Sequence, residues 1–274
     1  MRSIFETTTL NNGVKMPWLG LGVYKAENGK EIVDTIKEAV LNGYRSIDTA
    51  AVYENEEGVG QALREIDVPR EQMFITTKVW NDRQGFDETL KAFEESREKL
   101  GVDVVDLYLV HWPVTGMFKE TWRAMEKLYK EGRVRAIGVS NFNIHHLEKL
   151  LEDAEVIPAV NQMEYHPLLT LPELHVYCKE KGIQLEAWSP LTRGRIFDRP
   201  ELVSIAEKHG KSPAQVILRW DLQNEVVTIP KSVTPSRIKQ NAQIFDFELD
   251  EQDMNTLNGM NENHRFSQDP DTFV

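Results

Sequence analysis

The chain has little cysteine, no long apolar run and no excess of positive charge, and each shortage excludes a class of protein. Cys178 is the only cysteine among 274 residues, so an intramolecular disulfide cannot form. No apolar stretch approaches the roughly 18 residues that a membrane span needs. Acidic residues outnumber basic ones by 44 to 32, and the net charge of −12 argues against nucleic acid as the main partner.

The N-terminal segment and the cysteine usage together favour a reducing cytoplasm. Residues Met1–Leu10 contain Arg2 and Glu6 and lack the apolar centre of a signal peptide. A single cysteine is typical of intracellular proteins. We therefore expect a cytoplasmic protein without a membrane partner, and its 41% of hydrophobic residues predict a sizeable core.

Short apolar runs alternate with helical patterns along the whole chain, and no linker interrupts them. The predicted strands are Trp18–Gly20, Ser46–Asp48, Phe74–Lys78, Val105–Leu109, Ala136–Val139, Ala159–Gln162, Gln184–Trp188 and Val226–Ile229. The predicted helices between them are Lys30–Leu41, Gly58–Glu65, Asp87–Leu100, Thr121–Lys130, His145–Leu151, Pro172–Lys181 and Pro213–Gln223. This alternation predicts a parallel sheet, and its eight units favour an α/β fold of the (β/α)8 TIM barrel type in a single domain, 1–274.

Three additions to the barrel are expected. Thr7–Leu10 and Val14–Met16 flank Asn12-Gly13, a strong hairpin signal, and this N-terminal β-hairpin would cap the closed end of the barrel. Ser204–His209 predicts an extra helix. The tail after Asn263 has few apolar residues and is expected to lie on the surface.

Chemistry in such a barrel collects at the carboxyl ends of the strands. Polar or aromatic residues suited to ligand contact stand at or just after seven of these ends: Asp48 with Tyr53, Lys78 with Trp80, His111 with Trp112, Ser140 with Asn141, Gln162, Trp188 with Ser189, and Lys231 with Ser232. Seven such endings predict one continuous rim rather than scattered polar residues.

Four ionisable residues of this rim form a coherent set for acid catalysis. Reduction of a carbonyl needs a hydride on carbon and a proton on oxygen. Tyr53 could donate the proton if the ammonium of Lys78 lowers the tyrosine pKa below its ordinary value of about 10. Asp48 would hold Lys78, and a neutral His111 would orient the substrate oxygen. The alternative is that all four are ordinary buried polar residues.

Three motifs on these strands resemble the aldo-keto reductase superfamily over nearly the whole chain. They are Gly43–Ala50 continuing to Gly60, Gly138–Phe142, and Ile229–Ser232 followed by Arg237, Gln240 and Asn241. The resemblance implies a catalytic tetrad of Asp48, Tyr53, Lys78 and His111, with Tyr53 as the proton donor. It is strongest to the bacterial branch that includes methylglyoxal and 2,5-diketogluconate reductases.

The same resemblance implies that NADPH is the cofactor. The nicotinamide would lie against Trp188, where many eukaryotic members have tyrosine or phenylalanine, and its carboxamide would contact Ser140, Asn141 and Gln162. A basic patch of Lys231, Arg237 and Lys239 would hold the 2′-phosphate. The full set of expected cofactor contacts is Ser140, Asn141, Gln162, Trp188, Ser189, Leu191, Lys231, Ser232, Arg237, Gln240 and Asn241. Gln240 stands where many relatives have glutamate.

The expected substrate pocket has an apolar wall over a polar base. Its expected lining residues are Val23, Tyr24, Trp80, His111, Trp112 and Phe118. The loop at 191–200 and the C-terminal tail are short, which favours an open pocket and a broad substrate range. Arg193 and Arg195 could select acidic or polyhydroxy carbonyls, or could be surface charges.

These observations favour a monomeric NADPH-dependent reductase of aldehydes and α-dicarbonyls such as methylglyoxal. Reduction of sugar-derived ketones such as 2,5-diketogluconate is an alternative within the same chemistry. A cofactor-binding regulatory module is a further alternative, against which the complete tetrad argues. We expect no metal, because neighbouring side chains on a helix, as at His145-His146, point about 100° apart and no ligand cluster is evident.

Overall fold

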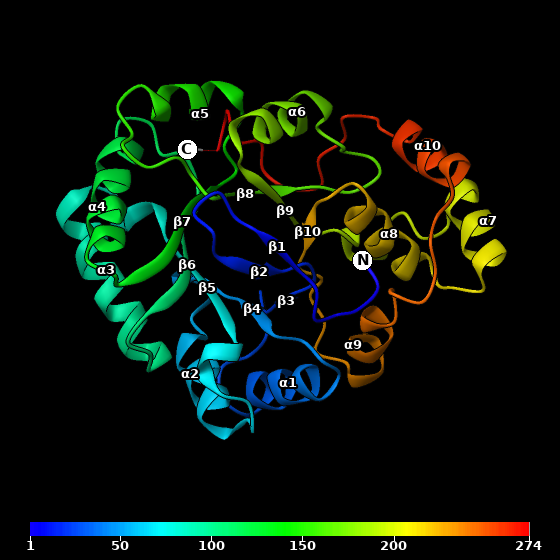
Figure 1. The fold of residues 1–274 in the computed structure, drawn as a ribbon, viewed down its shortest axis with the longest axis horizontal. Helices are drawn as coiled ribbons and strands as arrows, with labels where there is room; N and C mark the ends of the chain where they lie inside the picture. The colour runs from blue at the N-terminus through cyan, green and yellow to red at the C-terminus, as the bar shows by residue number, and fades with distance from the viewer. Residues whose placement is uncertain (274) are drawn as a thin grey trace.

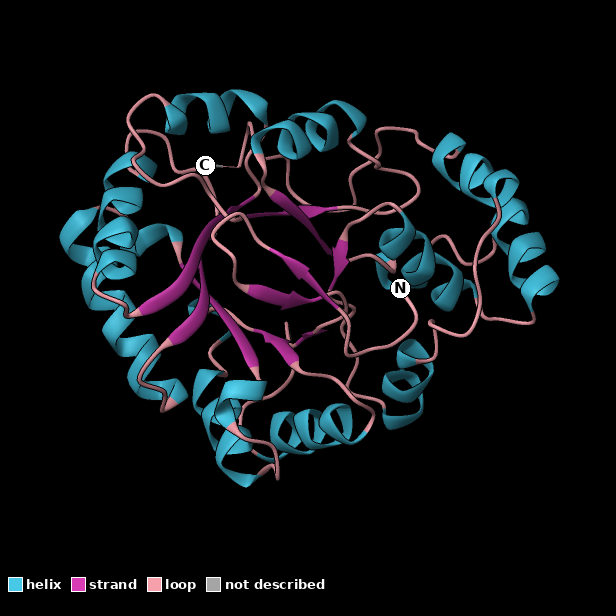
Figure 2. Ribbon diagram, in the orientation of Figure 1, coloured by secondary structure: helices cyan, strands magenta, loops and turns pink. Residues whose placement is uncertain are grey.

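The computed structural model describes residues 1–273 as a parallel barrel surrounded by helices (Figures 1 and 2). Eight parallel strands are hydrogen-bonded in the order β10-β9-β8-β7-β6-β5-β4-β3. Their bounds are β3 Leu21–Gly22, β4 Ser46–Asp48, β5 Phe74–Val79, β6 Val105–Val110, β7 Val134–Ser140, β8 Val160–Glu164, β9 Gln184–Trp188 and β10 Val227–Thr228. The (β/α)8 prediction is confirmed.

The barrel closes between its first and last strands, and here the predicted strand Trp18–Gly20 needs correction. Regular strand begins only at Leu21, while the preceding residues form a seam: the Gly20 amide donates to Thr228 O at 2.9 Å, and the Thr228 amide donates to Trp18 O at 3.0 Å. A Cβ at Gly22 would lie 2.8 Å from Ile229 O. Close approach of the Ile229 backbone therefore explains Gly22, whereas a Cβ at Gly20 would lie 2.9 Å from the side-chain Oγ of Ser46.

Helices follow the strands around the outside of the barrel. Their bounds are α1 Lys30–Leu41, α2 Glu56–Glu65, α3 Phe86–Leu100, α4 Phe118–Lys130, α5 Ile144–Leu151, α6 Pro172–Lys181, α7 Pro200–His209, α8 Pro213–Gln223, α9 Pro235–Ala242 and α10 Glu251–Gly259. Helix α10 was not predicted; it begins with a capping box in which the Asp250 side chain accepts from the Asp253 amide. It lies beside α7, outside the ring of helices (Figure 1).

The N-terminal hairpin, β1 (Thr7–Thr9) with β2 (Lys15–Pro17), crosses one end of the barrel as expected (Figure 1). Its apolar residues Leu10 and Met16 are buried in a cluster with interior side chains of the strands, including Leu107 and Leu109. This cluster fills the end of the barrel at which the strands begin. Ligands therefore have access only at the opposite end, where the strands finish.

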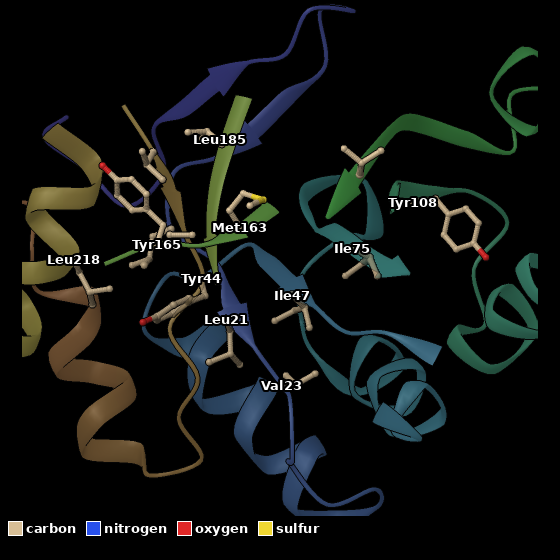
Figure 3. Close-up of a cluster of buried hydrophobic side chains, with 14 of the residues drawn as sticks. Leu21, Val23, Tyr44, Ile47, Ile75, Tyr108, Met163, Tyr165, Leu185 and Leu218 are labelled. Atoms are coloured by element: carbon tan, nitrogen blue, oxygen red, sulfur yellow. The ribbon is translucent and has the colours of Figure 1, made fainter. Parts of the chain in front are cut away.

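A larger apolar core packs the strands against the helices, and Figure 3 shows part of it. Outward-facing strand residues such as Ile47 and Ile75 contribute to it, as does Val23, which directly follows β3. Among residues 1–273, no helix is both long enough and apolar enough to cross a membrane.

Candidate active site

Asp48 and Lys78 form a buried ion pair at the carboxyl ends of β4 and β5. Lys78 Nζ donates to Asp48 Oδ1 at 2.6 Å and to the backbone oxygen of Thr49 at 2.9 Å. Both side chains are almost completely excluded from solvent. Burial alone would lower the pKa of Lys78, but Asp48 and Tyr53 outweigh burial and raise it, so the ammonium stays charged.

Tyr53 stands beside this pair, at the end of the 3-10 turn Ala51–Tyr53 that follows β4. Lys78 Nζ lies 5.2 Å from the centre of the tyrosine ring. The expected low pKa is wrong: burial raises the pKa of Tyr53 to about 12, and the opposing effect of Lys78 is smaller. The phenol therefore remains protonated, which is the form that a proton donor for carbonyl reduction must have.

His111 completes the expected tetrad as a neutral imidazole. Its ring centre lies 5.8 Å from that of Tyr53 and 5.0 Å from that of Trp80, both in edge-on arrangements. Burial, and then the charge of Lys78, hold the pKa of His111 well below its ordinary value. A neutral imidazole can donate one hydrogen bond to a nearby oxyanion, and it adds no second positive charge beside Lys78.

Ser140, Asn141, Gln162 and Trp188 form one hydrogen-bonded network on the adjoining strand ends. Asn141 Nδ2 donates to His111 O at 3.0 Å and to Ser140 Oγ at 3.1 Å. The indole N–H of Trp188 donates to Asn141 Oδ1 at 3.0 Å. The residues expected to contact a nicotinamide therefore lie together and are connected to the tetrad through His111.

The loop after β9 holds Ser189 and Leu191 near this network. Ser189 has a left-handed backbone with φ 52°, and Leu191 is half-buried against the core. Arg193 and Arg195 are both exposed, and the guanidinium of Arg195 lies 5.1 Å from the ring centre of Phe266 in the C-terminal tail. Arg195 thus contacts the tail.

The expected phosphate-binding residues lie on the segment that follows β10. Lys231, Arg237 and Gln240 are exposed, with Arg237 in the first turn of α9. Ser232 and Asn241 are buried; the Thr234 amide donates to Ser232 Oγ at 3.1 Å. Exposed basic side chains beside a helix N-terminus suit an anionic group.

Two of the six residues expected to line the substrate pocket are buried elsewhere in the core. Val23 is fully buried in the core, and Phe118 packs against Phe142 at 5.4 Å, so neither side chain is available to a substrate. Both belong to the larger apolar core between the strands and the helices. Tyr24 is exposed, and its ring centre lies 5.0 Å from that of Tyr53; Trp80 packs beside His111, and Trp112 is buried beneath Phe273.

Two residues of this region were not expected from the sequence. Phe273 packs on Trp112 with ring centres 4.6 Å apart, so the short tail reaches the pocket wall. Glu186 on β9 accepts a hydrogen bond from Gln162 in the barrel interior. The two-residue alternation along β9 could have indicated Glu186, because it shares the inward face with Trp188.

The expectation for His145 and His146 also needs correction. Their ring centres lie only 4.0 Å apart, and Asp271 from the tail lies 3.3 Å from His145 Nε2 and 3.8 Å from His146 Nε2. However, His146 Nδ1 accepts the Asn143 amide at 3.1 Å, and Asn143 Nδ2 donates to Asp271 at 2.7 Å. Since a neutral His146 then carries its proton on Nε2, the group is a helix cap that fastens the tail, and we assign no metal to it.

Comparisons with known proteins show the family of the chain. Residues 18–262 match the family model "Aldo/keto reductase family". Glyoxal reductase of Bacillus subtilis is 60% identical over 99% of both chains, and methylglyoxal reductase DkgA of Escherichia coli is 46% identical over 96% of both. The crystal structure of a Gox0644 mutant in complex with NADPH covers 98% of both chains at 44% identity, with a TM-score of 0.93.

The closed parallel barrel, the buried lysine–carboxylate pair beside a protonated tyrosine and the family match together identify an oxidoreductase. The chain belongs to the aldo/keto reductase family.

Proposed function

We propose that this protein reduces glyoxal-type α-dicarbonyls and aldehydes to alcohols with NADPH. The observation that carries the proposal is the Asp48–Lys78 pair, which places a permanent ammonium beside the protonated phenol of Tyr53. The glyoxal and methylglyoxal reductases to which the chain is similar support the substrate class. The NADPH complex of Gox0644 supports the cofactor.

The residues present fit a nicotinamide cofactor. Trp188 is half-buried and offers a stacking face, and the side-chain carbonyl oxygen of Gln162, Oε1, accepts no hydrogen bond from residues 1–273. Lys231 and Arg237 would hold the 2′-phosphate, and Ser232, Gln240 and Asn241 lie on the same segment. NADPH, when bound, supplies the hydride.

The tetrad would supply the proton. Tyr53 would give its phenolic proton to the carbonyl oxygen as negative charge develops there, which is downhill because an alkoxide is a much stronger base than a phenolate. Lys78 would stabilise the phenolate that remains, and Asp48 would keep Lys78 in place and charged. Neutral His111 would donate a hydrogen bond to the same substrate oxygen and so orient the carbonyl.

The test is the initial rate of NADPH oxidation with methylglyoxal, an aromatic aldehyde and 2,5-diketogluconate, each repeated with NADH. We expect the fastest oxidation with methylglyoxal and NADPH. A higher kcat/KM for 2,5-diketogluconate would favour reduction of sugar-derived ketones instead. Tight NADPH binding without oxidation by any carbonyl would favour a regulatory module.

The variant Arg237→Ala tests the cofactor preference separately. It should raise the KM for NADPH severalfold and leave the KM for NADH unchanged, because only NADPH carries the 2′-phosphate. The control is Lys211→Ala, which removes one positive charge at a residue that donates to Asp246 away from the site.

We further propose that the chain forms a single domain and works as a monomer in the cytoplasm. Sedimentation would check the monomer, and cell fractionation would check the location.

A further inference from the structure

The amide of Gln162 lies between two carboxylates inside the barrel. Its Nε2 donates to Asp48 Oδ2 at 2.8 Å and to Glu186 Oε2 at 2.8 Å. All three side chains are buried, with at most 2% of each residue exposed. Asp48 binds Lys78 through its other oxygen, so a continuous chain of hydrogen bonds runs from Glu186 through Gln162 to the tetrad.

This arrangement determines which end of the amide faces the cofactor. The Asp48 carboxylate, paired with the Lys78 ammonium, only accepts hydrogen bonds, so the amino group of Gln162, rather than its side-chain carbonyl, must face Asp48, and its second hydrogen then reaches Glu186 Oε2. Both amide hydrogens are then used. What remains available is Oε1, and it accepts no hydrogen bond within the described part of the chain.

Glu186 is an unusual residue to bury for structural reasons alone. Its second oxygen, Oε1, is buried and has no hydrogen-bond partner among residues 1–273. Burial, followed by the charge of Asp48, raises the pKa of Glu186 to about 8. A buried carboxyl with an incomplete set of partners opposes folding, and its position two residues before Trp188 on the same strand points to a role at the cofactor.

We propose that Glu186 is a positioning residue for the nicotinamide cofactor. Together with Asp48 it holds Gln162 so that the Gln162 carbonyl oxygen meets the amino group of the nicotinamide carboxamide. The inference rests on the proposed use of a nicotinamide cofactor and adds a residue outside the tetrad. It implies that the site recognises the carboxamide as a hydrogen-bond donor at this point.

The test compares the dissociation constants of NADP⁺ and its 3-acetylpyridine analogue, in which a methyl group replaces the amino group of the carboxamide. No carbonyl substrate is needed. The wild-type protein should bind NADP⁺ about 3- to 10-fold more tightly, the range for one hydrogen bond. In Glu186→Met one amide hydrogen of Gln162 is released and can turn toward the cofactor, so this ratio should fall toward one.

Two further variants separate positioning from a general loss of structure. Glu186→Gln keeps an acceptor oxygen for Gln162 and should keep the wild-type ratio. Asp221→Asn alters another buried carboxyl, which accepts from Thr228 at 2.7 Å outside this network, and should also keep it. If Glu186→Met does not fold, Gln162→Met serves instead and should abolish the preference.

A folded Glu186→Met protein with an unchanged ratio would overturn the proposal. So would a wild-type protein that does not discriminate between the two cofactors; if that protein still reduced methylglyoxal with NADPH, the proposed function would stand. A wild-type protein that binds neither NADP⁺ nor NADPH would overturn both.

Discussion

Lys78 Nζ lies 2.6 Å from Asp48 Oδ1, and neither side chain has appreciable contact with solvent. Such a pair contributes little net stability when complete, because removing two charges from water offsets their attraction. Removing one partner of the pair destabilises the protein, because an unpaired charge then remains in the interior. The pair therefore makes the catalytic centre and the stability of the barrel depend on the same two residues.

Replacing Asp48 should damage both properties together. Asp48→Asn leaves Lys78 without its counter-charge and should lower the free energy of unfolding by about 3–5 kcal/mol. Urea unfolding measures this, and kcat should fall with it. Asp34→Asn removes the exposed pair with Lys30 and should leave stability nearly unchanged. Equal effects of the two substitutions would contradict a buried charge pair.

The indole N–H of Trp188 should contribute to cofactor binding apart from ring stacking. Trp188→Phe keeps an aromatic face but loses the hydrogen bond to Asn141. We expect a rise of about 3- to 10-fold in the NADPH dissociation constant, measured by calorimetry. Trp188→Ala removes stacking as well and should bind still more weakly. Identical affinities of the Phe variant and the wild type would show that the Trp188–Asn141 bond has no part in binding.

The sequence predicted elements best where a local pattern alone determines them. Lys30–Leu41 and Gln184–Trp188 were predicted with the correct ends, because their apolar periodicity and flanking residues suffice. The Trp18–Gly20 strand was misplaced because the barrel seam depends on contact with residues near Thr228, far away in sequence.

The candidate site also contains residues that a local pattern predicts and properties that depend on contacts with other parts of the chain. Asp48, Tyr53, Lys78 and His111 could be predicted because each lies at or after the carboxyl end of a strand. The pKa of Tyr53 could not, since it depends on the balance between burial and one ammonium. Phe273 was also missed, because its contact with Trp112 joins residues more than half the chain apart.

The stability of the protein should carry a pH signature of Glu186. Folding raises the pKa of Glu186 from 4.5 to about 8, so between these values the folded state binds more protons than the unfolded state. The free energy of unfolding therefore falls as pH rises through this window. The Glu186→Gln variant has no carboxyl at this position, so its free energy of unfolding should not fall in this way.

Thermal unfolding at a series of pH values measures the difference. The Tm of Glu186→Gln minus that of the wild type should increase from about pH 5 to pH 8 and then level off. The corresponding change in the free energy of unfolding is on the order of a few kcal/mol. Glu201→Gln, on the surface of α7, supplies the control and should show no such trend. A Tm difference between Glu186→Gln and the wild type that does not change with pH would mean that Glu186 is ionised over this whole pH range.

The C-terminal tail should influence the size of substrate accepted. Phe273 covers part of Trp112, and Asp271 fastens the tail to Asn143. Phe273→Ala should therefore lower the KM for bulky aromatic aldehydes relative to methylglyoxal by about 2- to 5-fold, a change expected from uncovering one apolar contact. Kinetics with both substrates measure the ratio. If KM rises for both, Phe273 instead forms part of the binding surface.

The central claim is that Tyr53 donates the proton in carbonyl reduction, and Tyr53→Phe tests it most directly. The substitution removes one oxygen atom from a half-buried ring and keeps its contact with Tyr24. NADPH affinity and methylglyoxal turnover should be measured on the same preparation. We predict nearly unchanged NADPH binding with turnover reduced by about 100-fold or more. Turnover close to that of the wild type would contradict the assignment of Tyr53 as the proton donor.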